Sequence, residues 1–296
     1  MDMTKRAWLE IPAGVRCICV SDIHGELALF KKLLDKMGFC EADILILLGD
    51  LYLKGSEPDA TLEYIVDLAK RPNVHVLRGN CDWRHDKHQE WLDDLPMIIE
   101  SDDYVFVHGS PEDVRENAFM EGAGLQEKWT VAGHWPVNNY CHEIACVNPI
   151  INREKRIIAI DGGCINAPGG QLNGFVIRDG KFSFDSVDRF PMAVATHRQK
   201  EAKGTLNITW NDRFVTVVKR RPEFSVVRHN ASGIEIEVPT ACLRKDEEGA
   251  MWCESLTNHR PAVRPGDAVA VVASFSDRHY IKKDGILGWI GLEVIE

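Results

Sequence analysis

Short apolar runs alternate with amphipathic stretches along the first part of the chain. The runs at 15–20, 43–48 and 73–77 are rich in branched side chains and have the length of strands. The second run, which is apolar at every position from 44 to 48, is typical of a strand buried on both faces. The intervening stretches, 26–39 and 58–69, repeat apolar residues at helical spacing. Strands joined by helical crossovers predict a parallel sheet with right-handed connections.

From residue 97 onward the pattern changes to hairpins and isolated short strands, after a polar helix expected at 85–95. Two short apolar segments flank a Ser-Asp-Asp turn, which is typical of a β-hairpin. We interpret residues 1–192 as one layered α/β domain whose strand ends converge on one edge. Its later elements are expected to be a hairpin over 97–107, a helix over 114–129, strands over 130–134 and 156–161, and a hairpin over 172–187.

The C-terminal third has a different pattern. Residues 193–205 are small, polar and charged, and they predict a linker. Residues 206–296 contain seven short strand-like runs separated by turns rich in Gly, Pro, Asn and Asp, which predict a small all-β barrel. The closing run, 280–290, resembles bacterial SH3-like domains. That resemblance implies an SH3-like barrel that binds a peptide or a protein.

Composition narrows the classes of partner. The 296 residues carry a formal net charge of −10, which argues against a general nucleic-acid or anionic-membrane binder. No apolar run reaches the length of a membrane span, and the first twelve residues lack the apolar core of a secretion signal. The nine cysteines form no CxxC pair, which fits a reducing compartment. We therefore expect a cytoplasmic protein.

Polar residues of a few types follow five of the predicted strands. Carboxylate, amide and imidazole donors without thiolates suit divalent metals such as Mn, Fe or Zn. Two such ions that share a carboxylate can clamp a phosphoryl oxygen during in-line displacement. The candidate ligands are Asp22, His24, Asp50, Asn80, His108 and His134.

The blocks that contain these residues resemble the calcineurin-like metallophosphoesterases. Their order and spacing are most similar to the compact bacterial branch of the serine/threonine phosphoprotein-phosphatase (PPP) family, near the symmetrical diadenosine tetraphosphate hydrolases. The resemblance covers roughly residues 15–190 and implies an α/β/β/α sandwich. It is carried by Ser21-Asp22-Ile23-His24-Gly25, Gly49-Asp50-Leu51-Tyr52-Leu53-Lys54-Gly55, Arg78-Gly79-Asn80-Cys81-Asp82, Val107-His108-Gly109, Gly133-His134 and a closing block in two pieces, 160–164 and 170–174.

The resemblance also implies a role for each ligand. The expected cofactors are two divalent ions, first of all Mn²⁺, with Fe or Zn as alternatives. A hydroxide that bridges them is expected to attack phosphorus in line, so that no phospho-enzyme forms. Asp22 and His24 are expected to bind the first metal, and Asp50 to bridge both metals. The expected ligands of the second metal are Asn80, His108 and His134.

The sequence departs from the resembled phosphatases at the residues that handle the phosphate and the leaving group. Their second block usually ends in Asp-Arg-Gly and their third reads Gly-Asn-His-Glu, whereas here the positions read Leu53-Lys54-Gly55 and Gly79-Asn80-Cys81-Asp82. The missing His normally protonates the leaving oxygen, a contribution of about 10²–10⁴-fold. Cys81 and His85 stay open as replacement acids.

Two basic residues are candidates for phosphate contact. Lys54 keeps a positive charge where the resembled enzymes have Arg, but as a point donor without the bidentate fork. Arg78 precedes the Gly-Asn turn, and it is either a phosphate contact or the donor of a structural ion pair.

Three functions remain open at this point. The leading interpretation is a two-metal phosphomonoesterase of the serine/threonine phosphatase type, acting on a phosphoprotein or a small phosphoester. Cys81, in place of an acidic His, favours the alternative of a phosphodiesterase or dinucleoside polyphosphate hydrolase, whose substrates have better leaving groups. The third is a non-catalytic scaffold that keeps the fold and binds through its C-terminal domain.

Overall fold

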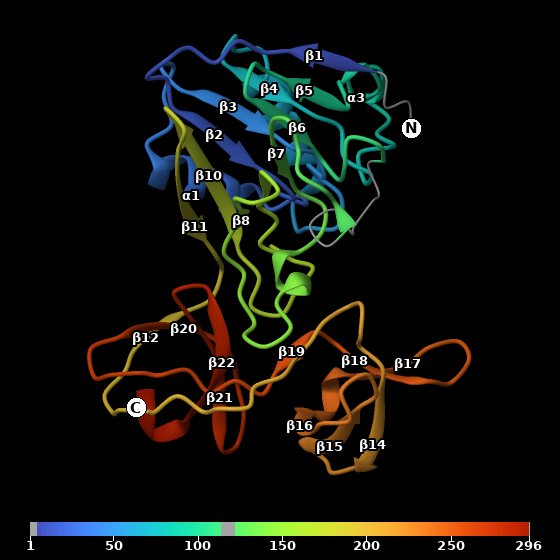
Figure 1. Ribbon diagram of the computed structural model, residues 1–296, viewed down its shortest axis with the longest axis vertical. Helices are drawn as coiled ribbons and strands as arrows, with labels where there is room; N and C mark the ends of the chain where they lie inside the picture. The colour runs from blue at the N-terminus through green and yellow to red at the C-terminus, as the bar shows by residue number, and fades with distance from the viewer. Residues whose placement is uncertain (1–4, 114–121, 296) are drawn as a thin grey trace. The chain divides into compact units, whose positions relative to one another are not determined.

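The computed structural model describes residues 5–113 and 122–295, and the chain divides into two compact units (Figure 1). The domain boundaries expected from the sequence stay a prediction. Residues 193–205, expected to be a linker, include the end of strand β12, which pairs with β20. The first unit comprises Met1–Val137, Asn148–Asn166 and Gly170–Arg189, and the second comprises Asn138–Val147, Ala167–Gly169 and Phe190–Glu296.

Two β-sheets form the centre of the first unit. One has the strand order β11-β10-β2-β3-β4, in which β2, β3 and β4 run parallel. The other has the order β1-β5-β6-β7-β9-β8, in which β6, β7 and β9 run parallel. The strands are β1 (Arg6–Trp8), β2 (Cys17–Val20), β3 (Ile44–Leu47), β4 (Val74–Val76), β5 (Ile98–Glu100), β6 (Tyr104–Val107), β7 (Trp129–Ala132), β8 (Ile150–Asn152), β9 (Ile157–Ala159), β10 (Leu172–Arg178) and β11 (Lys181–Val187).

Alternation along β2 decides which of two hydrophobic cores each side chain joins. Cys17 and Cys19 pack with residues of the six-stranded sheet, in the core between the sheets. Ile18 and Val20 point the other way and pack with the helices. Because both faces of this sheet are covered, the central strands are apolar at every position, as the sequence pattern indicated.

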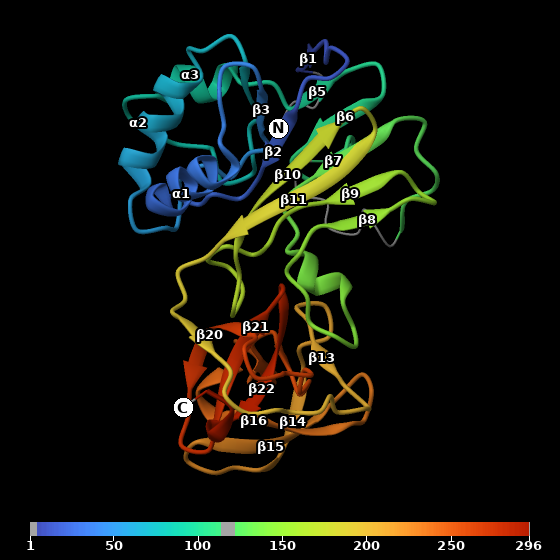
Figure 2. The same cartoon turned by 90° about the vertical axis from the view of Figure 1, so that its left-hand side faces the viewer.

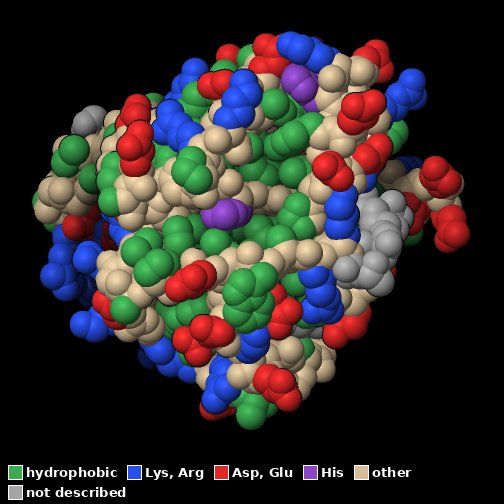
Figure 3. Space-filling view, turned by 90° about the horizontal axis from the view of Figure 1, so that it is seen from above, with side chains coloured by type: hydrophobic (Ala, Val, Ile, Leu, Met, Phe, Trp, Pro, Cys, Tyr) green, Lys and Arg blue, Asp and Glu red, His purple; other side chains and the backbone are tan. Residues whose placement is uncertain are grey.

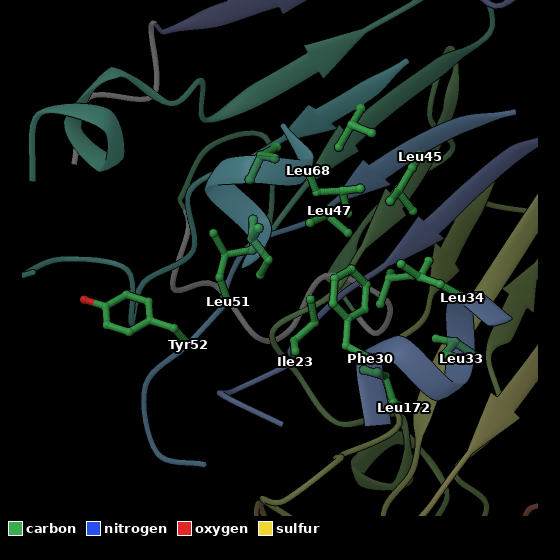
Figure 4. Packing of buried hydrophobic residues seen from close by; sticks show 14 of the residues in the cluster. Ile23, Phe30, Leu33, Leu34, Leu45, Leu47, Leu51, Tyr52, Leu68 and Leu172 are labelled. Carbon is green, nitrogen blue, oxygen red and sulfur yellow. The ribbon is translucent and has the colours of Figure 1, made fainter. Parts of the chain in front are cut away.

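Three helices cover the outer face of the five-stranded sheet: α1 (Leu27–Met37), α2 (Pro58–Leu68) and α3 (Gln89–Asp94) (Figure 2). Phe30, Leu33 and Leu34 of α1 are buried in the same cluster as the strand residues, and Figure 4 shows how they pack. Helix α1 ends at Gly38, whose φ of 60° is the left-handed conformation common after a helix. Pro58 opens α2, where its missing N–H costs nothing.

The described part of the second unit consists of small β-sheets and short 3₁₀ turns. One sheet has the order β12-β20-β21-β22 and another β14-β15-β16, while β13 pairs with β19 and β17 with β18. An SH3-like barrel stays a prediction for this unit. The elements are β12 (Met192–Val194), β13 (Asn207–Ile208), β14 (Val215–Lys219), β15 (Phe224–His229), β16 (Glu235–Pro239), β17 (Leu243–Lys245), β18 (Met251–Cys253), β19 (Leu256–Thr257), β20 (Ala268–Ser274), β21 (Arg278–Lys283) and β22 (Ile286–Gly291), with 3₁₀ turns at Val137–Tyr140, Thr240–Cys242 and Leu292–Ile295.

Some expected elements differ from the structure. Of the helix expected over 114–129, residues 114–121 lie outside the described part, residues 123–128 are irregular, and Trp129 begins β7. The mixed α/β architecture is as expected. An α/β/β/α sandwich also needs a second outer helical layer, which the helix expected over 114–129 would supply. That part of the expected fold therefore stays a prediction. Strands β17, β18 and β19 were not anticipated, because they are only two or three residues long and lie among charged residues.

The surface carries both signs of charge. On the face seen in Figure 3, acidic and basic side chains are interspersed around small hydrophobic patches. Within residues 5–113 and 122–295, no helix has the length and apolar character that crossing a membrane requires. All nine cysteines are free thiols.

Candidate metal centre

The expected ligands follow strands that are neighbours in the two sheets. Asp22, Asp50 and Asn80 come after β2, β3 and β4, and His108 and His134 come after β6 and β7. Parallel strands end at the same edge, so these residues emerge side by side. Backbone bonds tie the exits together: the Asp22 N–H donates to the Gly49 carbonyl at 3.1 Å, and the Gly133 N–H donates to the His108 carbonyl at 2.8 Å.

Side chains link the exit loops of the two sheets to each other. His108 Nδ1 lies 2.7 Å from the carbonyl oxygen of Leu48, which follows β3. The His134 N–H, which follows a strand of the six-stranded sheet, donates to Asp22 Oδ2 at 2.8 Å. The same oxygen accepts the hydroxyl of the neighbouring Ser21 at 2.5 Å. The site is therefore built from both sheets and is fixed by hydrogen bonds between them.

Asp50 lies between two histidines. Its Oδ2 is 3.6 Å from His24 Nε2, and its Oδ1 is 3.3 Å from His108 Nε2. The Cys81 N–H donates to Oδ1 at 2.8 Å and holds the carboxylate in this orientation. Asp22 Oδ1 lies 3.6 Å from the same His24 nitrogen. One carboxylate thus presents one oxygen to each histidine, which is the arrangement required to bridge two cations.

The hydrogen bonds of the two histidines leave one nitrogen of each ring with a lone pair. His24 Nδ1 lies 3.1 Å from the Leu53 carbonyl, and His108 Nδ1 bonds the Leu48 carbonyl. A carbonyl only accepts, so each Nδ1 carries the proton and each Nε2 is the electron-pair donor. Carbonyl partners of this kind orient histidine ligands in metal sites.

Around His108, several electron pairs converge without a hydrogen atom between them. The Nε2 lone pair faces Asn80 Oδ1 at 2.9 Å and Asp50 Oδ1 at 3.3 Å. The amide nitrogen of Asn80 points to the Cys81 sulfur at 3.4 Å instead. A cation among these atoms would replace lone-pair repulsion by coordination, so the residues present fit a metal ion.

Burial disfavours the charged forms of Asp22 and His24. It raises the pKa of Asp22 well above its usual value, and the neighbouring Asp50 carboxylate raises it further. Burial also lowers the pKa of His24 to about 4, so this ring is neutral at neutral pH. Neutral imidazole and carboxylate are the forms that bind metals, and a divalent ion would supply the missing positive charge.

Asp82 and Asp161 are two further buried carboxyl groups close to the centre. Burial, followed by the Asp50 charge, raises the pKa of Asp82 to about 7, although the Leu51 and Gly79 N–H groups donate to it at 2.8 Å each. Burial and Asp22 raise the pKa of Asp161 well above its usual value. Asp161 Oδ1 accepts the Gly163 N–H at 2.7 Å.

Candidate donor atoms gather into two groups that share Asp50. Asp22, Asp50 and His108 form one group and His24, Asp50 and Cys81 the other, and within each the donor atoms lie within 4.8 Å of one another. The His134 ring lies against that of His108, with centroids 5.0 Å apart. All six expected ligands therefore lie in one place, while their assignment as metal ligands stays a prediction.

The structure gives Cys81 and Lys54 different surroundings. Cys81 is half-buried, and burial together with the Asp50 charge raises its pKa to about 12, so the thiol is protonated at neutral pH. Lys54 is exposed, with a left-handed φ of 86°. Its charge lowers the pKa of Asp22 and of His24, although burial has the larger effect on both groups.

Arg78 and His85 contact other parts of the loop. Arg78 donates to the Asp82 carbonyl and to the Asp93 carboxylate, at 2.8 Å each, which favours the structural role over phosphate contact. His85 lies between Tyr52 and His88, with ring centroids 5.6 and 5.2 Å away. Its Nε2 is 3.5 Å from the exposed Asp59 carboxylate, and it has no hydrogen bond or ion pair with an expected ligand among the described residues.

The exit turns hold non-glycine residues in a backbone conformation that L-amino acids avoid. Asp22, His24, Asp50 and His134 have φ values of 55°, 49°, 52° and 67°. Such residues gather where the surrounding structure enforces them, commonly at functional sites. Gly133 is required in the same region, because a Cβ there would lie 2.7 Å from Asp22 Oδ2.

One contact was not anticipated from the sequence. Asn166 Nδ2 lies 2.8 Å from His24 Nε2. Asn166 is in a turn rich in Gly and Pro and belongs to none of the periodic segments, so no sequence signal indicated it.

Comparison with known proteins gives a family match. Residues 15–163, half of the 296-residue chain, match the family model described as calcineurin-like phosphoesterase. No curated protein sequence is a significant match to the chain.

Solved structures give weak similarities. A candidate diadenosine tetraphosphatase is 19% identical with a TM-score of 0.47, and the alignment covers 61% of this chain and 97% of that one. A metallophosphoesterase from Sphaerobacter thermophilus is 19% identical with a TM-score of 0.45, covering 59% and 89%. A protein serine/threonine phosphatase from Saccharomyces cerevisiae is 14% identical with a TM-score of 0.45, covering 63% and 84%.

Proposed function

Because the chain belongs to the calcineurin-like phosphoesterase family, we propose that it is a phosphomonoesterase of the serine/threonine phosphatase type. Family membership makes it a metal-dependent phosphoester hydrolase with divalent ions at a binuclear centre. The proposal adds the substrate class, a phosphoprotein or small phosphomonoester, and Mn²⁺ as the native ion. The observation that carries it is Asp50, which presents one carboxylate oxygen to His24 and the other to His108.

In the proposed site, Asp22, His24 and Asp50 hold the first ion, and Asp50, Asn80, His108 and His134 hold the second. Two bound divalent ions lower the pKa of the attacking water and neutralise charge on the phosphoryl oxygens. The chain's own residues position the reactants. The Leu53 and Leu48 carbonyls hold the rings of His24 and His108 in the tautomer that offers Nε2.

Protonation of the leaving group decides which esters react well. The Cys81 thiol, with its pKa raised to about 12 by burial and Asp50, is a weak acid. Alkoxide leaving groups such as serine depend on a strong proton donor, whereas aryl and phosphoanhydride groups leave more readily. This observation favours the second candidate function, a phosphodiesterase or dinucleoside polyphosphate hydrolase.

The direct test compares substrates on the full chain after removal of metals and addition of Mn²⁺. We expect p-nitrophenyl phosphate to be hydrolysed faster than bis(p-nitrophenyl) phosphate and faster than a dinucleoside tetraphosphate. Asp50→Asn should abolish turnover, whereas Asp67→Asn, an exposed residue of α2, should not change it. Preference for the diester or the polyphosphate would establish the second candidate instead. Lack of turnover with Mn²⁺, Fe²⁺ and Zn²⁺ would contradict both enzymatic functions and would favour the non-catalytic scaffold.

A single substitution tests the leaving-group argument. Cys81→His should restore an imidazole acid at the position where the sequence lacks one. We expect hydrolysis of a phosphoserine peptide to rise by about 10²-fold, the lower end of general-acid effects, and hydrolysis of p-nitrophenyl phosphate to stay within about twofold. Equal gains on both substrates would contradict the assignment, because a better leaving group does not depend on the acid.

Peptide or protein binding by the second unit stays a prediction. That unit exposes Trp210 and Phe214, whose side chains are 51% and 40% exposed. The Arg213 guanidinium lies 3.6 Å from the centroid of the Trp210 ring. Exposed aromatic and arginine side chains are common in protein interfaces, which supports this prediction.

A further inference from the structure

Asn166 contacts the metal centre although no motif assigns it a role. It lies in the turn that follows Asp161, and its backbone N–H donates to the Gly163 carbonyl at 2.9 Å. The residue is exposed, while its side-chain nitrogen reaches the fully buried His24 at 2.8 Å. It therefore lies where the solvent meets the first metal position.

The His24 atom in this contact is the one with the lone pair. Because Nδ1 bonds the Leu53 carbonyl, Nε2 accepts a hydrogen bond from the Asn166 amide in the metal-free chain. The same Nε2 also faces Asp22 Oδ1 and Asp50 Oδ2, each 3.6 Å away. Of these three side chains around the nitrogen, Asn166 is the nearest.

Binding of a cation at Nε2 would remove the acceptor of this hydrogen bond. The amide NH₂ group would then face a positive charge, which is unfavourable. An asparagine amide can turn over and offer its carbonyl oxygen instead, a hard donor of the kind that Mn²⁺ and Mg²⁺ prefer. The contact that orients His24 without metal would become a coordinating contact with it.

We propose that Asn166 is a ligand of the first metal, presenting Oδ1 to the ion held by Asp22, His24 and Asp50. This inference rests on the proposed function, since it assumes a metal at that position. Asp22, His24 and Asp50 supply three donors, fewer than the six that octahedral ions such as Mn²⁺ take. The Asn166 carbonyl oxygen at this exposed edge would add a fourth donor.

Titration of the metal-free full chain with Mn²⁺ in a calorimeter tests the inference. The wild type should bind two ions. Asn166→Ala should weaken one of the two binding events by at least about 10-fold, since loss of a ligand should cost no less than loss of a residue that supports one, and leave the other unchanged. Asn166→Asp should keep or improve the affinity, because it retains an oxygen donor and adds charge. Asn211→Ala, an exposed turn residue of the second unit, is the matched control and should bind as the wild type does.

The outcomes separate the possible errors. If the wild type binds two ions and Asn166→Ala binds them equally well, this inference is wrong and the proposed function stands. If Asn166→Asp weakens binding as much as Asn166→Ala, the amide acts as a hydrogen-bond donor to His24 and not as a ligand, which also overturns it. A wild type that binds no Mn²⁺ would overturn the proposed function itself. Far-UV circular dichroism of each variant distinguishes loss of metal from loss of fold.

Discussion

The two ends of strands β2 and β3 differ in how their buried aspartate side chains are paired. At the start of these strands, Arg16 grips the Asp43 carboxylate with two hydrogen bonds, Nε to Oδ1 at 2.8 Å and Nη2 to Oδ2 at 2.6 Å. At the far end, Asp22 and Asp50 pair with no arginine or lysine within the described ranges 5–113 and 122–295.

The pKa values of Asp43 and Asp22 reflect this difference in pairing. The bond from Arg16 lowers the pKa of Asp43, whereas burial and the second carboxylate raise that of Asp22. A buried carboxylate without a cation is costly, so it persists only where something outside the chain neutralises it or where function requires it. One end of the sheet is therefore complete within the polypeptide, whereas in the proposed function the other end is completed by bound metal ions.

The largest expected effect is a difference in metal binding and turnover between substitutions at the two ends of β2 and β3. Asp22→Asn should reduce Mn²⁺ affinity and turnover by more than about 100-fold, since it removes the negative charge of a ligand, which should cost more than losing a neutral supporting residue. Asp43→Asn should leave both quantities within about twofold, because Asp43 lies at the other end of the strands. Calorimetry and initial rates measure the pair. Equal losses in the two variants would mean that the ends are not functionally distinct.

Stability should respond to metal at one end only. At a free Mn²⁺ concentration 100 times the dissociation constant, each occupied site should raise the free energy of unfolding by about 2.7 kcal/mol. The gain should appear in the wild type and in Asp43→Asn, and it should shrink in Asp22→Asn. Chemical unfolding with and without Mn²⁺ provides the measurement. Equal stabilisation of all three proteins would contradict this account.

Removing the internal cation should cost stability without affecting the metal. Arg16→Ala leaves the buried Asp43 carboxylate without its partner, and we expect a loss of about 2 kcal/mol in the free energy of unfolding. Lys70→Ala is a suitable control, because its ion pair with Asp67 is exposed and should contribute less than about 1 kcal/mol. A loss no larger than that of the control would show that the Arg16 pair is not structural.

The smallest effect concerns pH. The pKa of Asp43 is lowered from 3.8, so the unfolded chain takes up this proton at a higher pH than the folded chain does. The stabilisation by the Arg16 pair is therefore complete above about pH 4 and is lost as pH falls through the folded pKa. The stability difference between wild type and Asp43→Asn should be about 2 kcal/mol at pH 7 and should decrease below pH 3.8. A difference that stays constant to pH 2 would contradict the assignment.

The sequence predicted those features that depend on local pattern. The runs that became β2 and β3 were recognisable because both faces of their sheet are buried, and the expected ligands could be placed together because parallel strands end at one edge. Asn166 could not be found in this way. Its contact with His24 depends on the path of a turn 142 residues away in the chain, and no periodicity marks it. Arg78 was ambiguous because a basic side chain next to a site gives no sign of its partner until Asp93 is brought beside it.

The left-handed turns at the strand exits set a limit on how this protein can be improved. Glycine adopts that conformation without penalty, whereas other residues lose roughly 1–2 kcal/mol in it. Replacing Asp22, His24 or Asp50 by glycine would relax the backbone and remove a donor at the same time. Selection for heat resistance alone, in the absence of added metal, would therefore favour substitutions at these positions and would yield more stable but inactive variants. Any such campaign on this scaffold must select for turnover in every round.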